Sequence, residues 1–119
     1  MKINILFENK EDYLYSEVSG DFDATEIMSY IQIVKNKCDE ENARKVLISF
    51  MGLNGTIDQE IDRYYLGEAI AQIIGYKIKI ALVWYERNIN KFAETVAVNR
   101  GADFRVFSDF GTAKKWLMV

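Results

Sequence analysis

The side chains that could carry chemistry gather in the middle of the chain, around one threonine and three carboxylates. Thr56 offers a hydroxyl, and Asp58, Glu60 and Asp62 follow it at alternate positions. Carboxylates at this spacing diverge on a helix, because residues three or four apart share a face and residues two apart do not. We therefore interpret the three carboxylates as a solvated face, with a cation site as the alternative.

Catalysis would have few of its usual groups here. The chain has no histidine and a single cysteine, Cys38. Histidine is the commonest general base and the commonest neutral metal ligand. Because the chain has none, a nucleophile–histidine pair is excluded, and a zinc site would need other ligands. No glycine-rich phosphate loop of known spacing is present. We expect no enzyme activity, no catalytic residue, no metal and no cofactor, although carboxylate, lysine or tyrosine chemistry stays open.

Length and composition favour one folded domain over residues 1–119. Half of the residues are hydrophobic, which is enough apolar material to form a core, and the net charge is −3. That charge argues against a nucleic-acid partner. One cysteine cannot form an intramolecular disulfide, and no apolar run is long enough to span a bilayer or to serve as a signal peptide. We expect a cytoplasmic protein with no integral membrane segment.

Hydrophobic periodicity predicts the elements that position these residues. Apolar residues alternate or form short runs in the expected strands and recur at helical spacing in the expected helices. Two pairs have the spacing of a capping box at a helix start: Asp23 with Glu26, and Thr56 with Gln59. The expected elements are a hairpin of strands 3–7 and 13–18, a helix from Asp23, a strand over 46–51, a helix over 57–74, a strand over 78–84, a helix from Asn88 or Asn90, a strand over 104–107 and a helix capped by Ser108 or Asp109.

This order predicts an α/β fold in which the strands from Val46 onward are parallel, since strand–helix–strand units are right-handed. The carboxyl ends of parallel strands share one edge, where ligands of open α/β sheets bind. Asn54 and Gly55 follow one buried strand, and Trp84 and Tyr85 end the next. These residues are candidate binding residues; a tight turn at Asn54-Gly55 and aromatic rings packed on the loop are the alternatives.

The helix over 57–74 carries apolar residues around more than one face, so it needs a second surface to cover. A neighbouring helix, a second subunit or a ligand would provide that surface. Tyrosine and arginine are favoured at protein interfaces, and we therefore predict that Arg63, Tyr64 and Tyr65 contact a partner.

Several segments of the second half resemble the STAS-domain family, in its SpoIIAA-like branch of small bacterial proteins named for the anti-sigma-factor antagonists. They are Arg63–Glu68 (RYYLGE), Lys77–Val83, Phe92–Gly101 (FAETVAVNRG) and Val106–Asp109 leading to Trp116-Leu117. The resemblance implies an N-terminal β-hairpin followed by βαβαβα, a mostly parallel five-stranded sheet with strands in chain order, and helices mainly on one face.

The functional element that the resemblance implies is a loop after the central strand, where relatives carry Asp-Ser-Ser/Thr-Gly and phosphorylate a serine. The corresponding stretch here, Leu53–Asp58, lacks that motif, and only Thr56 offers a hydroxyl. Thr56 is therefore either a possible phosphosite, favoured by the positive end of a helix, or a plain helix cap.

Three functional hypotheses follow. The leading one is a non-enzymatic, STAS-like protein-interaction module that forms a homodimer, with a regulatory role as one option. Its contacts run from the loop after the central strand along the next helix. The alternative is a small-molecule or lipid carrier, because some relatives are grouped with Sec14-like domains and the aromatic residues could line a pocket for a small apolar ligand. The third keeps a phosphoswitch at Thr56.

Overall fold

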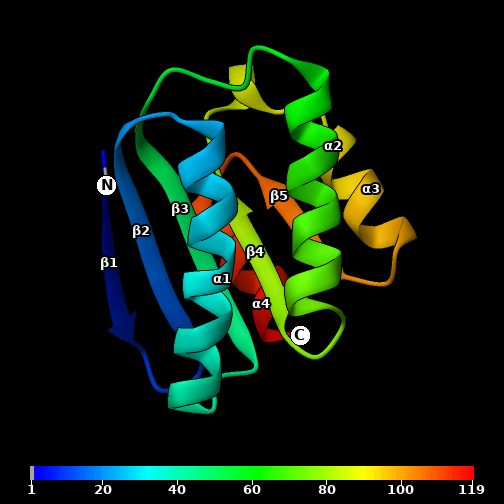
Figure 1. The fold of residues 1–119 in the computed structure, drawn as a ribbon. Helices are drawn as coiled ribbons and strands as arrows, with labels where there is room; N and C mark the ends of the chain where they lie inside the picture. Colours follow the sequence, from blue (N-terminus) through cyan, green and yellow to red (C-terminus); the bar gives the residue numbers. More distant parts are fainter. Residues whose placement is uncertain (1) are drawn as a thin grey trace.

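The computed structural model describes residues 2–119, and in it the strands lie side by side in chain order (Figure 1). They are β1 (Ile3–Asn9), β2 (Leu14–Asp21), β3 (Lys45–Asn54), β4 (Lys79–Val83) and β5 (Asp103–Phe107). β1 is antiparallel to β2, and each later neighbouring pair is parallel. The predicted hairpin and the predicted parallel sheet are both confirmed, and β3 is central.

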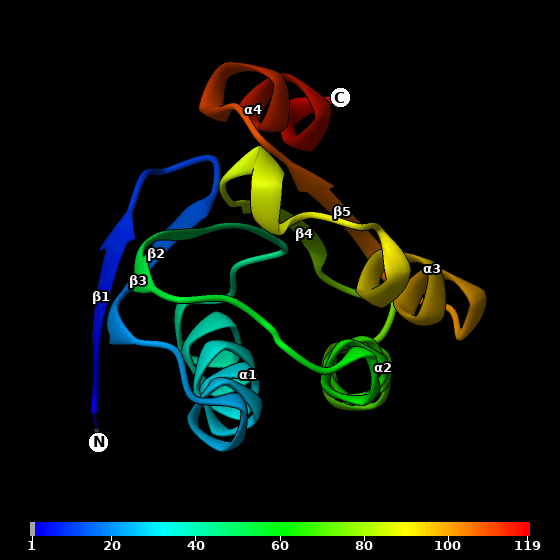
Figure 2. The same cartoon turned by 90° about the horizontal axis from the view of Figure 1, so that it is seen from above.

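The helices divide unequally between the two faces of the sheet. They are α1 (Ala24–Glu41), α2 (Glu60–Ala69) with its π-helical continuation η1 (Ile70–Ile74), the 3₁₀ turn η2 (Glu86–Asn88), α3 (Phe92–Asn99) and α4 (Phe110–Met118). Seen along the sheet, α1, α2 and α3 lie on one side and α4 on the other (Figure 2). The expected α/β architecture with helices mainly on one face is confirmed.

Two apolar cores follow from this layering. On the three-helix side, Val46, Ile48 and Phe50 of β3 pack with α1 and α2, while on the other side Leu47 packs with Leu117 of α4. Because β3 and β4 are covered on both faces, their sequences are nearly unbroken apolar runs. The sheet thus holds its central loops on a rigid support.

The start of α1 follows the sequence pattern. The Asp23 carboxylate accepts a hydrogen bond from the backbone N–H of Glu26 at 3.1 Å, which satisfies one of the free donors of the first turn. The Glu26 carboxylate accepts from the backbone N–H of Lys2 instead of closing a reciprocal box. The predicted cap at Asp23 is therefore confirmed, and Glu26 ties the start of the chain to the helix.

The predicted start of the second long helix is wrong. α2 begins at Glu60, its N-cap is Gln59 in an extended conformation, and Thr56 lies outside the helix. α2 lies beside α1 and away from the end of β3 (Figure 2). The segment that connects β3 to α2 therefore runs extended before the helix starts. The predicted end is confirmed, since Gly75 follows η1 with φ of +70°, a conformation that glycine adopts easily.

The third predicted helix also starts later than either asparagine. Asn88 closes the turn η2, and α3 begins at Phe92 after Lys91, whose φ is +66°. The Asn90 side chain still contributes, because its Oδ1 accepts from the backbone N–H of Phe92 at 3.0 Å. In the last helix Asp109, one of the two predicted caps, accepts from the backbone N–H of Thr112 at 2.7 Å.

None of the helices within residues 2–119 is long and apolar enough to cross a membrane.

Candidate functional site at the carboxyl edge of the sheet

The corner at Asn54 is built by the ends of two neighbouring parallel strands. Asp21 at the end of β2 is in register with Asn54 at the end of β3. The Asn54 Nδ2 donates to Asp21 Oδ1 at 3.3 Å, and the Asn54 carbonyl accepts from the backbone N–H of Phe22 at 2.9 Å. Gly55 then turns the chain with φ of +88°. The predicted position of Asn54 and Gly55 on the carboxyl edge is confirmed.

An open groove of about 610 Å³ lies beside this corner. The residues that line it come from the β2–α1 connection, the β3–α2 connection and the first turn of α2, namely Asp21, Phe22, Ala24, Asn54, Gly55, Thr56, Asp58, Gln59 and Asp62. Three of these side chains are carboxylates, and no lysine or arginine of residues 2–119 is among them. The groove is therefore a negatively charged surface in which Asp21, Phe22, Asp58 and Asp62 join the predicted residues.

Thr56 lines the groove, but its hydroxyl is not exposed there. Its Oγ1 is shielded from solvent and has no hydrogen-bond partner among residues 2–119. Because α2 starts only at Glu60, the hydroxyl also lacks the helix N-terminus that would favour a phosphate. The hypothesis of a phosphosite at Thr56 thus loses its electrostatic argument.

The solvent side of α2 carries two exposed apolar side chains one turn apart, Ile61 and Tyr65, each 49% exposed. Tyr64 differs from them, because its hydroxyl donates to Glu68 Oε2 at 3.0 Å and accepts from Arg100 Nη2 at 3.1 Å. Of the predicted tyrosine pair, Tyr65 is therefore free to contact another molecule, while Tyr64 ties α2 to the end of α3. Ile61 is an interface candidate that the residue-type argument missed, since isoleucine gives no such signal.

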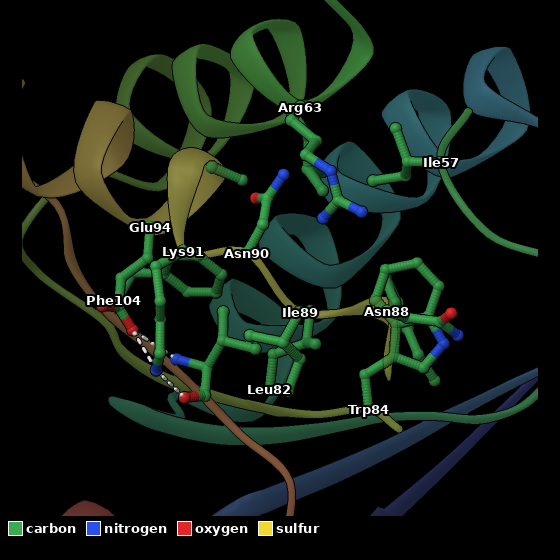
Figure 3. A pocket seen from close by; sticks show the side chains of 14 residues that line it. Ile57, Arg63, Leu82, Trp84, Asn88, Ile89, Asn90, Lys91, Glu94 and Phe104 are labelled. Atoms are coloured by element: carbon green, nitrogen blue, oxygen red, sulfur yellow. Dashed lines mark hydrogen bonds and ion pairs between the residues drawn. The ribbon is translucent and has the colours of Figure 1, made fainter. Parts of the chain in front are cut away.

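Arg63 does not lie on that solvent side. Its side chain is nine-tenths buried and turns under α2 into a pocket, where its Nε lies 3.2 Å from Glu60 Oε1 (Figure 3). The prediction that Arg63 belongs to an exposed interface is not supported by its burial. A position two residues from Tyr65 on a helix points elsewhere, which is the geometric reason for the difference.

The aromatic pair after β4 is packed inward. Trp84 is 3% exposed and lies edge-on to Phe50, with ring centroids 5.4 Å apart. Tyr85 is half-buried, and its hydroxyl donates to the Met51 carbonyl at 3.1 Å. Of the two interpretations of Trp84 and Tyr85, the structure favours packing against the neighbouring loop. The alternating pattern of β4 already indicates that Trp84 packs inward, because Ile80, Leu82 and Trp84 share one buried face.

The pocket under α2 is narrow. Its volume is about 20 Å³, which is room for about one water molecule. Most of its walls are apolar, from Phe50, Leu66, Leu82 and Phe104, with Arg63 and Asn88 among the polar lining residues. In this conformation it has no space for a lipid tail.

Residues 2–119 contain neither a group of side chains placed to hold a metal ion nor a reactive thiol. Within residues 2–119, no group of three or more His, Cys, Asp or Glu side chains is placed to hold a metal ion. Burial raises the pKa of the Cys38 thiol from 9.0 to about 11, so at neutral pH this cysteine is an uncharged core residue rather than a nucleophile.

Comparison with known proteins gives a match of fold. No protein-family model and no curated protein sequence matches the chain. Among solved structures, an anti-sigma factor antagonist from Mycobacterium paratuberculosis superposes with a TM-score of 0.66 at 11% identity, over 98% of this chain and 95% of the other. An uncharacterized protein of the DUF3478 family from Shewanella loihica, described as having a SpoIIAA-like fold, superposes with a TM-score of 0.52 at 22% identity, over 97% and 93%.

Proposed function

We propose that this chain, which has the SpoIIAA-like fold, is a non-enzymatic regulatory module that binds a protein partner. The contact surface, which we call the rim, consists of the groove beside Asn54–Thr56 and the solvent-facing residues Ile61 and Tyr65 of α2. One solved structure of this fold is an anti-sigma factor antagonist, a name that describes action on another protein.

The observation that carries the proposal is the continuity of the rim. Asp62 lines the groove and precedes Tyr65 by three residues, so these two side chains share a face of α2, and Ile61 lies one turn before Tyr65. Exposed apolar side chains beside an open polar groove are the arrangement of a small interface, in which an apolar centre has a polar border. A tyrosine near the centre is a typical energetic anchor.

The charge of the rim indicates the chemistry of its partner. Asp21, Asp58 and Asp62 face the same groove, so a partner that presents lysine or arginine there would associate faster and be favoured over an acidic one. Raising the salt concentration should weaken such a complex, because these carboxylates are exposed and screened by ions.

We further propose that the same surface supports the predicted homodimer through Ile61 and Tyr65. Facing copies of the acidic groove would repel each other, so this dimer should be weak and should strengthen with salt, opposite to a complex with a basic partner. Light scattering after size exclusion tests it: the mass of wild type should rise with concentration, and that of Tyr65→Glu should not. Tyr76→Glu is the matched control, since Tyr76 is exposed but lies beyond the far end of α2. A Tyr65→Glu variant that associates like wild type would contradict the dimer.

A small-molecule or lipid carrier is the second candidate and finds less support. The apolar pocket that the helices cover holds about one water molecule, against the several hundred Å³ of a typical ligand site. A carrier function would require α2 or α3 to move away from the sheet. Native mass spectrometry of freshly purified protein distinguishes the two, because a carrier would retain a bound molecule.

A further inference from the structure

β1 forms a free edge of the sheet. It stands at one end of the strand order and at the margin of the molecule, and no other element of residues 2–119 lies beyond its outer side (Figure 1, Figure 2). It runs over the seven residues Ile3–Asn9 and pairs with β2 without a register shift. A strand of this length at an edge offers a row of backbone donors and acceptors to another strand.

The hairpin shows which backbone groups of β1 are turned outward. The Lys10 N–H donates to the Tyr13 carbonyl at 2.9 Å, so Lys10 turns its backbone groups toward β2. Successive residues of an antiparallel strand turn these groups alternately to the two sides. The residues of β1 whose N–H and C=O groups point away from β2 are therefore Ile3, Ile5, Phe7 and Asn9.

β1 lacks the features that usually prevent an edge strand from pairing. Edge strands in natural proteins are commonly very short or carry charges, proline or a bulge. The opposite edge, β5, is five residues long and exposes Asp103 and Arg105. β1 is longer, carries one charged residue, Glu8, and has Leu6 at its centre with 43% of that residue exposed. Of the two edges, β1 is therefore the one suited to pairing.

Apolar side chains that are covered only in part run along the same edge. Ile5 and Phe7 pack against the core on the three-helix side but stay partly exposed. The Lys37 Nζ lies 6.0 Å from the centre of the Phe7 ring, which places that flank of α1 beside β1. Ile33 lies one turn earlier on the same flank and is also partly exposed. A strand added at this edge would gain free energy by covering Ile5 and Phe7.

We propose that β1 pairs with β1 of a second copy, antiparallel and about a two-fold axis at Leu6, so that the two sheets join into one. In this register Ile5 faces Phe7 of the other copy, and both turn their backbone groups outward, so they can exchange hydrogen bonds. Leu6 faces its own equivalent. Moving the axis to Ile5 or to Phe7 would shorten the paired segment. A two-fold contact is closed, so the product is a dimer.

The charges of β1 also fit a second copy of the same strand. Glu8 faces the neutral Asn4 of the other copy, and Lys2 of that copy lies diagonally beside it. Lys10 faces Lys2 beyond the strand end, and its Nζ is already paired with Glu8 Oε2 at 2.7 Å. Like charges that oppose each other destabilise a strand pair, and none do so within β1. The strand is therefore complementary to itself in both charge and apolar pattern.

This pairing goes beyond the rim, because no residue of β1 lines the acidic groove or belongs to α2. It opposes no acidic grooves and adds backbone hydrogen bonds, so we expect it to be the tighter of the two contacts. In light scattering the wild-type mass should start at two chains, and Tyr65→Glu should remain at two chains at every concentration. The two proposals fail separately, since Tyr65→Glu removes only the rim contact and Leu6→Lys removes only the β1 pairing.

Cysteine crosslinking tests the register. Leu6 and its equivalent would form a non-hydrogen-bonded pair with Cα atoms about 4.5 Å apart, a separation that a disulfide can bridge. Leu6→Cys should therefore give a disulfide-linked dimer with oxidised glutathione, whereas Tyr76→Cys, at a 73% exposed position outside β1, should not. Asn4→Cys should crosslink with co-produced Glu8→Cys but not with itself, since two Asn4 positions would lie about 13 Å apart along the strands. An unlinked Leu6→Cys protein, or Asn4→Cys that links equally well to itself, would overturn the proposal.

Amide hydrogen exchange tests the pairing without a crosslink. In wild type the outward N–H groups of Ile5 and Phe7 should be protected like the inward N–H of residue 6. Leu6→Lys, which opposes two lysines at the axis, should have the mass of one chain and lose protection at Ile5 and Phe7, while the inward amides stay protected by β2. Asn4→Lys is the matched control on the same exposed face; it places lysine opposite Glu8 and should keep both the dimer and the protection. Fast exchange at Ile5 and Phe7 in wild type, or a Leu6→Lys protein with the mass of two chains, would overturn the proposal.

Discussion

At the scale of single residues, burial decides which of the candidate side chains can meet another molecule. Arg63 and Tyr65 are two positions apart and of the types favoured at interfaces, yet Arg63 is 9% exposed and Tyr65 is 49% exposed. Residue type alone predicts both as interface residues. They differ because residues two positions apart on a helix point in different directions. The sequence therefore predicts which residue types could bind, but the contacts of α2 with the sheet decide which of them does.

Cys38 allows a test of the burial of α1 against the sheet. Because burial raises its pKa to about 11, the neutral thiol contributes stability that is complete below pH 9 and is lost as the pH rises toward 11. At pH 8 the thiolate fraction of the folded protein is about 100-fold lower than that of an unfolded thiol with a pKa of 9.0. Alkylation by iodoacetamide should therefore be at least about 100-fold slower in the folded protein than in urea. Rates within a few-fold of each other would show that Cys38 is accessible.

The cap at Asp23 allows a test of how α1 starts. Asp23→Ala removes the acceptor for the Glu26 backbone N–H and should lower the free energy of unfolding by about 1 kcal/mol. Asp23→Ser keeps a capping oxygen and is the control, with most of that stability retained. Urea denaturation of the three proteins measures the difference. An alanine variant as stable as wild type would mean that the cap contributes little here.

At the scale of elements, the sequence predicts the strands and the starts of the first and last helices, but not the starts of α2 and α3. β3 and β4 were predictable because strands covered on both faces are unbroken apolar runs, and Gly75 marked the end of the second long helix. The Thr56–Gln59 pattern suggested a cap that does not form. The distance from β3 to α2 requires an extended connection, and this requirement comes from the fold rather than from local residue preferences.

Gly67 shows how closely α2 and α3 pack. A Cβ at this position would lie 2.4 Å from the Ala93 carbonyl oxygen and 2.9 Å from Val96 Cβ. Gly67→Ala should therefore destabilise the fold by roughly 1–3 kcal/mol through overpacking, although alanine is the better helix former. Gln72→Ala, an exposed change in η1, is the control and should stay within about 0.5 kcal/mol of wild type. A more stable Gly67→Ala protein would contradict the close contact between the helices.

At the scale of the whole molecule, the order of the strands places the candidate site. Right-handed connections predicted the parallel strands, and the structure confirms β3 at the centre with Asn54 at its carboxyl end. Asp21 and Phe22 join the groove from a strand that is distant in sequence, so pattern reasoning along the chain did not find them. They follow only from the pairing of β2 with β3, which sets Asp21 beside Asn54.

Photo-crosslinking from the rim tests the central claim most directly. Tyr65 is replaced by p-benzoylphenylalanine, and the protein is produced in the cells from which the sequence comes. The control is the same replacement at Tyr76, which is 73% exposed and distant from the groove. The crosslinked products of the two proteins are then compared. We predict a discrete crosslinked protein from position 65 that is absent from position 76 and is lost when Asp58→Lys and Asp62→Lys reverse the charge of the groove. Identical products from both positions, or none from position 65, would contradict the assignment of the rim as a protein-binding surface.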